Sequence, residues 1–292
     1  MTPATGPVPA APPPSGSAPV GRLRRPARAW YVAWRITLLN LRAQLEYRAE
    51  FLLTIAFGIA WQSSVIVFAA VLLQRFPGMG GWSSEDVLLI VGMRMLSHAL
   101  YVLVFGRVHS LSFLVQEGLV DAWLLRPMPV YRQAQLSSFP TNGLGDLAVG
   151  VTMFAFAVQQ AEEPWTAGRV AFLVAGVVGG MLVESAVGTA MSCAAFRFPS
   201  TFYWSSWVEE LMATFGGYPL SILPRAVSGV FTFVLPLAFI AYFPAGVLTG
   251  HGSSLGVPVW LAALSPLVGL ALFVGARLLW NRSLRHYTGV NG

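Results

Sequence analysis

Residues 170–195 read VAFLVAGVVGGMLVESAVGTAMSCAA, and this stretch decides the class of fold. It exceeds the ~20 apolar residues that a helix needs to cross the hydrocarbon core of a bilayer. Its one charged residue is Glu184, and because an ionisable group is costly to bury in a membrane, Glu184 is a functional candidate. Gly176 and Gly180 form a small-xxx-small pattern, which favours close helix packing within the subunit; a dimer seam is the alternative.

Five further stretches are long and apolar enough to cross a bilayer. They run over about 51–73, 87–106, 143–160, 201–223 and 257–279. The composition agrees, since 55% of the residues are hydrophobic and only 10% are charged, whereas soluble domains carry roughly 25% charged residues. The sequence therefore predicts an all-α integral membrane protein with six transmembrane helices.

One apolar stretch, AVSGVFTFVLPLAFIAYFPAGVL at 226–248, is interrupted by Pro236 and Pro244. Proline removes a backbone donor, and a broken helix at membrane depth persists only where protein or water satisfies the freed groups. We interpret this stretch as a re-entrant helical hairpin on the outer side of the membrane. In the alternative interpretation, 226–248 is a full transmembrane span and 201–223 is not.

Arginine placement predicts the orientation, because cytoplasmic segments of membrane proteins are enriched in basic residues. All 18 basic residues are arginine. With the N-terminus inside, Arg75, Arg169 and Arg225 fall outside and Arg94 falls within a span, which leaves fourteen arginines on the cytoplasmic side. Both termini are therefore expected in the cytoplasm.

Two segments precede the first span. Residues 1–29, rich in proline and alanine, cannot bury a core, so we expect a disordered cytoplasmic tail. Residues 30–50 place apolar side chains on one helix face and arginines on another, as in a helix that lies in the membrane interface. The apolar set is Trp34, Leu38, Leu41 and Leu45.

Few ionisable side chains lie within the spans, and each is a candidate for the transport pathway. They are Arg94, His98, Glu184, Glu209 and Glu210, with Asp146 at the start of the third span. Arg94 and His98 are four residues apart and share a helix face. A structural salt bridge between Arg94 and Glu184 is the simpler interpretation, and a direct substrate role is the alternative. No metal-ligand spacing and no nucleophile–base pattern is present, so we expect neither a metal site nor a catalytic residue.

The connector at 107–142 contains VQEGLVDAWLLRPMP at 115–129. On a short helix over 117–125, Glu117 and Asp121 would share a face, while Val120, Trp123 and Leu124 would supply bulky apolar surface. Acidic and apolar groups together on the cytoplasmic side suit a protein partner. The alternative is a helix resting on lipid headgroups, which fits less well because the cytoplasmic leaflet is itself anionic.

The absence of lysine excludes one class of function for this chain. A Walker-type phosphate loop needs a lysine that reaches the nucleotide phosphates, and the sequence contains none. If ATP drives the protein, another subunit must bind it.

The order and spacing of six motifs resemble bacterial ABC-2-type permeases, the membrane subunits of ABC transporters with the type V exporter fold. The motifs are LEYRAEF (45–51), GWSSEDVLLIVG (81–92), EGLVDAWLLRP (117–127), YPLSILP (218–224), VLPLAFIAYFPAGVLTG (234–250) and RSLRHYTG (282–289). The resemblance covers residues 30–289, which we therefore treat as one transmembrane domain.

The resemblance implies a connecting helix over 34–50, a coupling helix between spans two and three, and an outer re-entrant hairpin that contains Pro236 and Pro244. The residues that it implies for coupling to the ATPase are Glu117, Gly118, Leu119, Asp121, Leu124, Leu125, Arg126 and Pro127. It further implies an exporter in the bacterial cytoplasmic membrane, with two copies of a cytoplasmic ATPase that hold ATP and Mg²⁺. A second, distinct permease is the expected membrane partner, a homodimer is the alternative, and nucleic acid is not expected as a partner.

Two other functions stay open. A secondary transporter could use Arg94, His98 and Glu184 as a proton relay, although the internal repeats that such transporters often show are not visible. A membrane scaffold or immunity protein could bind a toxic peptide without moving it. Antibiotics, peptides, lipids and siderophores would all be compatible substrates.

Overall fold

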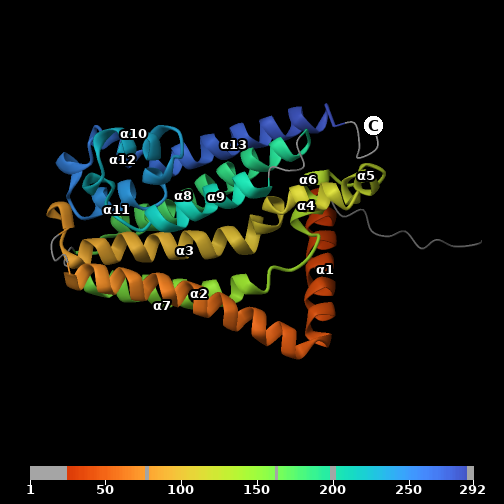
Figure 1. Cartoon of the computed structure of the whole chain (residues 1–292), viewed down its shortest axis with the longest axis horizontal. Coiled ribbons are helices and arrows are strands. Elements are labelled where there is room, and N and C mark those ends of the chain that lie inside the picture. The colour runs from red at the N-terminus through yellow and green to blue at the C-terminus, as the bar shows by residue number, and fades with distance from the viewer. Residues whose placement is uncertain (1–24, 76–78, 162–163, 198–201, 288–292) are drawn as a thin grey trace, which may run out of the picture.

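The computed structural model describes residues 25–75, 79–161, 164–197 and 202–287, and within these ranges the regular structure is helical. Long helices run side by side along one axis (Figure 1). They are α2 (Arg48–Arg75), α3 (Ser84–His109), α7 (Asn142–Gln160), α8 (Ala167–Ala195) and α13 (Ser265–Leu284). Because α7 packs on α2 and α3, and α8 packs on α3 and α13, their order across the bundle is α2, α7, α3, α8, α13.

Four helical segments of the described chain are long and apolar enough to cross a membrane: Arg48–Val71, Ser84–Gln116, Ala167–Ala195 and Ser265–Leu284. The second includes α4 (Leu111–Gln116), which continues α3. The all-helical membrane fold agrees with the sequence prediction, but four helices rather than six meet this criterion. The helix α7 falls short because Asn142 and Asp146 at its start and glutamines at its end dilute its apolar composition.

The predicted continuous span over 201–223 is wrong. The helix α9 (Phe202–Phe215) has 14 residues, so it is about 21 Å long, shorter than the ~30 Å hydrocarbon core. Gly216 and Gly217 follow it, and glycine is a poor helix former. The last span also differs from 257–279: α12 (Val259–Ala263) follows Pro258, and α13 then carries the long apolar run.

At one end of the bundle, α1 (Arg25–Glu46) lies across the bundle axis and is joined to α2 at Tyr47 (Figure 1). Side-chain amides of α1 hold it to the segment before α7: Asn40 Nδ2 donates to the Leu136 carbonyl and Gln44 Nε2 donates to the Phe139 carbonyl, each at 2.7 Å. The helix begins five residues before the expected position 30. Residues 1–24 of the predicted tail lie outside the described residues.

At the opposite end, the stretch 226–248 is divided into short pieces. They are α10 (Arg225–Phe233), a 3₁₀ helix (Leu237–Phe239) and α11 (Tyr242–Leu248). Pro236 lies between the first two pieces, where a proline cannot continue a helix. Pro244 lies in the first turn of α11, where no intrahelical donor is lost. The longest of these helices has nine residues, so this stretch does not form a continuous span.

Two hydrophobic cores stabilise the bundle, one toward each end. The larger joins α3 and α8 to the α10–α12 end around Trp82, Ile90 and Phe243. The smaller lies beside the connector, around Leu111 and Trp280. Arg94 and Glu184 are buried between the two cores, and their polar chemistry therefore lies at mid-bundle.

Close helix packing within the chain explains the glycines of α8. A Cβ on Gly176 would lie 3.0 Å from Met93 Cε, and a Cβ on Gly180 would lie 2.6 Å from the Ile240 carbonyl oxygen. Both residues are buried, so this small-residue pattern packs inside the subunit, and the dimer-seam alternative does not apply to it.

Candidate functional site: a buried ion cluster, an acidic cavity and an exposed connector

Glu184, in the middle of α8, joins two residues of α3. Its Oε1 accepts from Arg94 Nη1 at 2.7 Å, and His98 Nδ1 lies 2.8 Å from its Oε2. The Glu184 side chain is 2% exposed. The expected salt bridge is therefore present, and it satisfies both carboxylate oxygens in a buried environment where an unpaired charge would be costly.

The same cluster reaches α9. Arg94 Nη2 donates to the Met212 carbonyl at 3.3 Å, and a Cβ on Gly216 would lie 2.6 Å from Arg94 Nε. The glycine that follows α9 thus leaves room for the guanidinium. The cluster ties α3, α8 and α9 together, which is a structural role.

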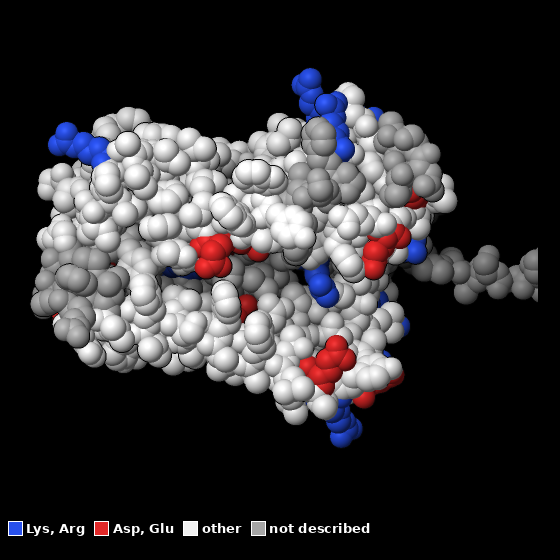
Figure 2. Space-filling model, viewed as in Figure 1, with Lys and Arg blue, Asp and Glu red and all other residues white. Residues whose placement is uncertain are grey.

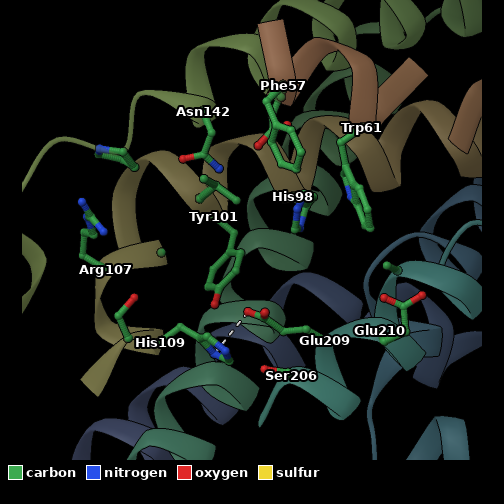
Figure 3. A pocket seen from close by; sticks show the side chains of 17 residues that line it. Phe57, Trp61, His98, Tyr101, Arg107, His109, Asn142, Ser206, Glu209 and Glu210 are labelled. Carbon is green, nitrogen blue, oxygen red and sulfur yellow. Dashed lines mark ion pairs between the residues drawn. The ribbon is translucent and has the colours of Figure 1, made fainter. Parts of the chain in front are cut away.

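Beside the cluster lies a cavity of about 500 Å³ between α2, α3, α7 and α9 (Figure 3). His98 belongs to both, since it contacts Glu184 and also lines the cavity. In the space-filling view the cavity opens as a hollow with acidic side chains within it and at its rim (Figure 2). Its ionisable lining residues are His98, Arg107, His109, Asp146, Glu209 and Glu210.

The structure brings the predicted pathway residues into this one region. Arg94, His98 and Glu184 form the cluster, while Glu209 and Glu210 project from α9 at the cavity. His109 was missed by the sequence reasoning, and it lies 3.2 Å from Glu209 Oε1. The helical spacing of His98 and His109, eleven residues apart, places them on the same face and could have predicted this.

Asp146, on α7, is the buried carboxylate of the cavity. It is 4% exposed and lines the cavity. Gly58 of α2 lies against it: a Cβ on Gly58 would be 3.3 Å from Asp146 Oδ1 and would overlap the Asn142 carbonyl. Close approach of α2 and α7 thus places Asp146 at the cavity wall.

The connector differs from the helix expected over 117–125. The helix α4 ends at Gln116, Gly118 has the left-handed φ of +69°, and α5 spans Leu119–Leu124. A left-handed turn is a conformation that glycine adopts readily. Glu117 therefore precedes the turn, and the prediction that it shares a helix face with Asp121 is wrong.

Two of the bulky connector residues face inward rather than toward a partner. Val120 is fully buried and Trp123 is 6% exposed, both in the smaller core. Gln133 of α6 (Val130–Gln135) fixes this arrangement, because its Nε2 donates to the carbonyls of Trp123 and Met128. The large exposed apolar residues of α5 and its end are Leu119, Leu124 and Leu125, and Leu125 is 89% exposed.

Asp121 also faces inward. It lies beside Tyr287, which follows α13, and burial together with this carboxylate raises the pKa of the Tyr287 hydroxyl to about 12. Glu117, Arg126 and Pro127 are exposed. Among the predicted coupling residues, Gly118 thus makes the turn, Asp121 contacts the C-terminal segment, and the rest are on the surface.

In the part of the chain that the structure describes, no group of three or more His, Cys, Asp or Glu side chains is placed to hold a metal ion. Long apolar helices packed side by side, with a buried ion cluster and a cavity between them, are the arrangement of a multi-pass membrane protein.

Comparison with protein families matches residues 59–291 to the ABC-2 family transporter proteins. The match covers most of the chain, and the chain belongs to this family of ABC transporter permeases, which are membrane components rather than catalytic subunits. No curated protein and no solved structure matches the chain significantly.

Proposed function

We propose that the chain is the permease subunit of an ATP-driven exporter and is coupled to a separate cytoplasmic ATPase through α5. The observation that carries this proposal is the division of α5 into two sides. Val120 and Trp123 are fixed in a core, while Leu119, Leu124 and Leu125 are exposed at the end of the molecule. Exposed leucines next to exposed Glu117 and Arg126 make a surface with an apolar centre and a charged rim, as protein interfaces have.

A hollow beside α5 adds to this surface. It has a volume of about 560 Å³ and is lined by Phe113, Leu114 and Leu119 together with Arg107 and Tyr203. A bulky side chain of a partner could insert there, with Leu124 and Leu125 around it. Because the chain contains no lysine for a Walker-type loop, the partner would supply the ATP and Mg²⁺ sites.

The packing around α5 supports a mechanism for the coupling. Trp280 of α13 contacts Tyr131 of α6 and Phe196 after α8, with ring centroids 5.0 Å apart in each pair. Closure of two ATPase copies on nucleotide binding would displace α5, and these contacts would carry the displacement to α8 and α13. Alternating access then follows if the ATPase contacts differ between two global states.

The remaining features complete the proposal. Six segments would cross a bacterial cytoplasmic membrane. Four are the long apolar helices, the fifth is α7, and the sixth is α9 together with the irregular segment that follows it up to residue 223, because α9 alone is too short. The helices α10 and α11 would form the outer re-entrant hairpin. Both termini would lie in the cytoplasm. A second permease, distinct or identical, would cover the face of α2 where Leu53 and Val67 are exposed.

Co-purification with the ATPase tests the coupling assignment. Leu125→Asp should abolish it, because the charge enters an apolar contact surface, and Glu117→Arg should weaken it. Ser253→Asp is the matched control, since it adds the same charge at an exposed position of the opposite end and should leave the complex intact. Normal recovery of the ATPase with Leu125→Asp and Leu124→Asp combined would overturn the assignment.

The His98–Glu184 contact beside the cavity favours one second candidate, a secondary transporter that moves protons through this pair. Transport in vesicles with ATP present and a collapsed proton gradient separates the two functions. An ATP-driven exporter should retain transport, and a proton-driven transporter should lose it.

A further inference from the structure

The wall of the cavity contains a buried carboxylate, Asp146, whose neighbouring imidazole is engaged elsewhere. Asp146 is 4% exposed, and the one counter-charge that acts on it among the described residues is His98, which does so through space. His98, the nearby base, directs its Nδ1 to Glu184 instead. Burial of an unpaired charge is costly, so the position of Asp146 at a cavity wall indicates a positively charged ligand.

The charges of the cavity point the same way. Asp146, Glu209 and Glu210 line it, together with the guanidinium of Arg107 and the imidazoles of His98 and His109. His109 lies 3.2 Å from Glu209 Oε1. Arg107 lies on the side of the cavity away from Trp61 and Glu210 (Figure 3). The three carboxylates of the cavity thus outnumber its guanidinium, and Glu210 lies on the side away from that guanidinium (Figure 3).

Aromatic rings also line the cavity. Phe57 and Trp61 of α2 and Tyr101 of α3 line the cavity, and Trp61 lies beside His98 in Figure 3. Phe57 and Trp61 are themselves within ring contact, with centroids 6.4 Å apart. The faces of aromatic rings attract cations, most strongly for tryptophan, and the rings also accommodate an apolar body.

The volume sets the size of the ligand. About 500 Å³ lies in the range of ~300–1,000 Å³ that is typical of sites for drug-sized molecules, and it is far larger than a bare metal ion needs. A phospholipid would contact the cavity with only part of its length.

We propose that this cavity binds an organic cation with an aromatic or apolar body, whose charge pairs with Asp146 and whose body packs on Phe57 and Trp61. That such a cation is the transported substrate rests on the proposed export function; the binding site itself does not. Glu210 supplies a second carboxylate on the facing helix α9 and would stabilise the ligand from the other side.

Two ions of nearly the same shape and opposite charge test the proposal. The sample is the full chain in nanodiscs, together with its ATPase where that co-purifies. Binding of tetraphenylphosphonium and binding of tetraphenylborate are measured separately, each against empty nanodiscs. We expect saturable binding of tetraphenylphosphonium above the empty-disc background and no saturable binding of tetraphenylborate.

Variants locate the site. Asp146→Asn keeps the size of the side chain, removes its charge and should weaken tetraphenylphosphonium binding at least about tenfold, as expected for loss of a buried charge pair. Trp61→Leu keeps an apolar wall without the ring and should weaken binding about fivefold. Glu46→Gln, which removes an exposed carboxylate of α1 outside the cavity, is the control and should bind as the unchanged chain does.

Each outcome decides the proposal. The proposal is overturned if both ions bind equally well or if tetraphenylphosphonium shows no saturable binding. It is also overturned if the Asp146→Asn chain elutes and melts normally and still binds tetraphenylphosphonium as the unchanged chain does. Binding is measured without ATP, so its failure is separate from failure of the export function. If the ATPase co-purifies but tetraphenylphosphonium does not bind, only the proposed cation site is rejected. If tetraphenylphosphonium binds but no ATPase co-purifies, only the proposed export function is rejected.

Discussion

Glu184 shows how one buried residue can hold three helices. Its two oxygens are engaged by Arg94 and His98, and Arg94 also contacts the Met212 carbonyl of α9. Such a cluster contributes specificity of packing rather than a large net stability, because desolvation of the charges offsets their attraction. Removal of one partner lowers the stability strongly, because it leaves the other charge buried and unpaired.

A double-mutant cycle on Arg94 and Glu184 should show this coupling. Arg94→Met and Glu184→Met should each destabilise the chain by about 3–5 kcal/mol, and the double variant should lose less than the sum of the two. Thermal unfolding in detergent measures the three variants. Additive losses would show that the pair is not coupled, and normal stability with lost transport would assign these residues to the substrate path instead.

At this scale, sequence reasoning identified the rare ionisable groups and the pairing of Arg94 with Glu184. It did not predict the contact of His98 with Glu184 or that of His109 with Glu209. The low frequency of charges in apolar helices made Arg94, His98, Glu184, Glu209 and Glu210 visible. The surroundings of Asp146 depend on which helices face one another. The periodicity of one helix does not contain that information.

Among the elements, α5 is the one whose interpretation changed most. The residue pattern 115–129 indicated a mixed acidic and apolar helix, but only the tertiary packing shows that Trp123 and Val120 are its buried side and that Gly118 separates Glu117 from it. Pattern alone could not assign sides, because both faces of this short helix carry large apolar residues.

The buried side of α5 yields a prediction about stability. Trp123→Ala should reduce the free energy of unfolding by about 3–5 kcal/mol, as large-to-small substitutions in cores do. Leu124→Ala, at a half-exposed position of the same helix, should change it by less than about 0.5 kcal/mol. Chemical unfolding in detergent provides the measurement, and similar losses for both variants would mean that α5 is not anchored through Trp123.

The contact of α8 with α13 gives a second prediction at this scale. A Cβ on Gly269 would overlap the backbone of Gly179, whereas a Cβ on Gly275 of the same helix meets nothing within 4 Å. Gly269→Ala should therefore force the helices apart and lower the melting temperature. Gly275→Ala should be neutral or stabilise by up to about 1 kcal/mol, because alanine favours helix. A reversed order of the two melting temperatures would contradict this packing.

For the whole molecule, the asymmetry of the two ends makes orientation testable. Cys193 is the single cysteine of the sequence and it is buried. In a Cys193→Ala background, Leu125→Cys and Ser253→Cys place one exposed thiol at each end. A membrane-impermeant maleimide should label the thiol at 253 in intact cells and the thiol at 125 only in inside-out vesicles. The opposite pattern would invert the proposed topology.

Sequence reasoning predicted the overall class of the molecule well and its helix ends less well. Apolar runs gave the all-helical membrane fold, and the prolines of 226–248 agreed with a segment of short helices. The extent of α9 was overestimated because hydropathy treats Gly216, Gly217 and Pro219 as neutral interruptions of an apolar run. Their backbone preferences end the helix at Phe215 instead.

The division of α5 into a buried and an exposed side has a consequence for how such proteins diversify. Different positions hold the helix in place and would contact a partner. The contact positions can therefore change while the anchoring positions stay constant. Exchange of Leu119, Leu124 and Leu125 for the residues of another permease should then redirect the chain to that permease's motor subunit. A duplicated gene could acquire a new partner in a few such steps, without passing through an unstable intermediate.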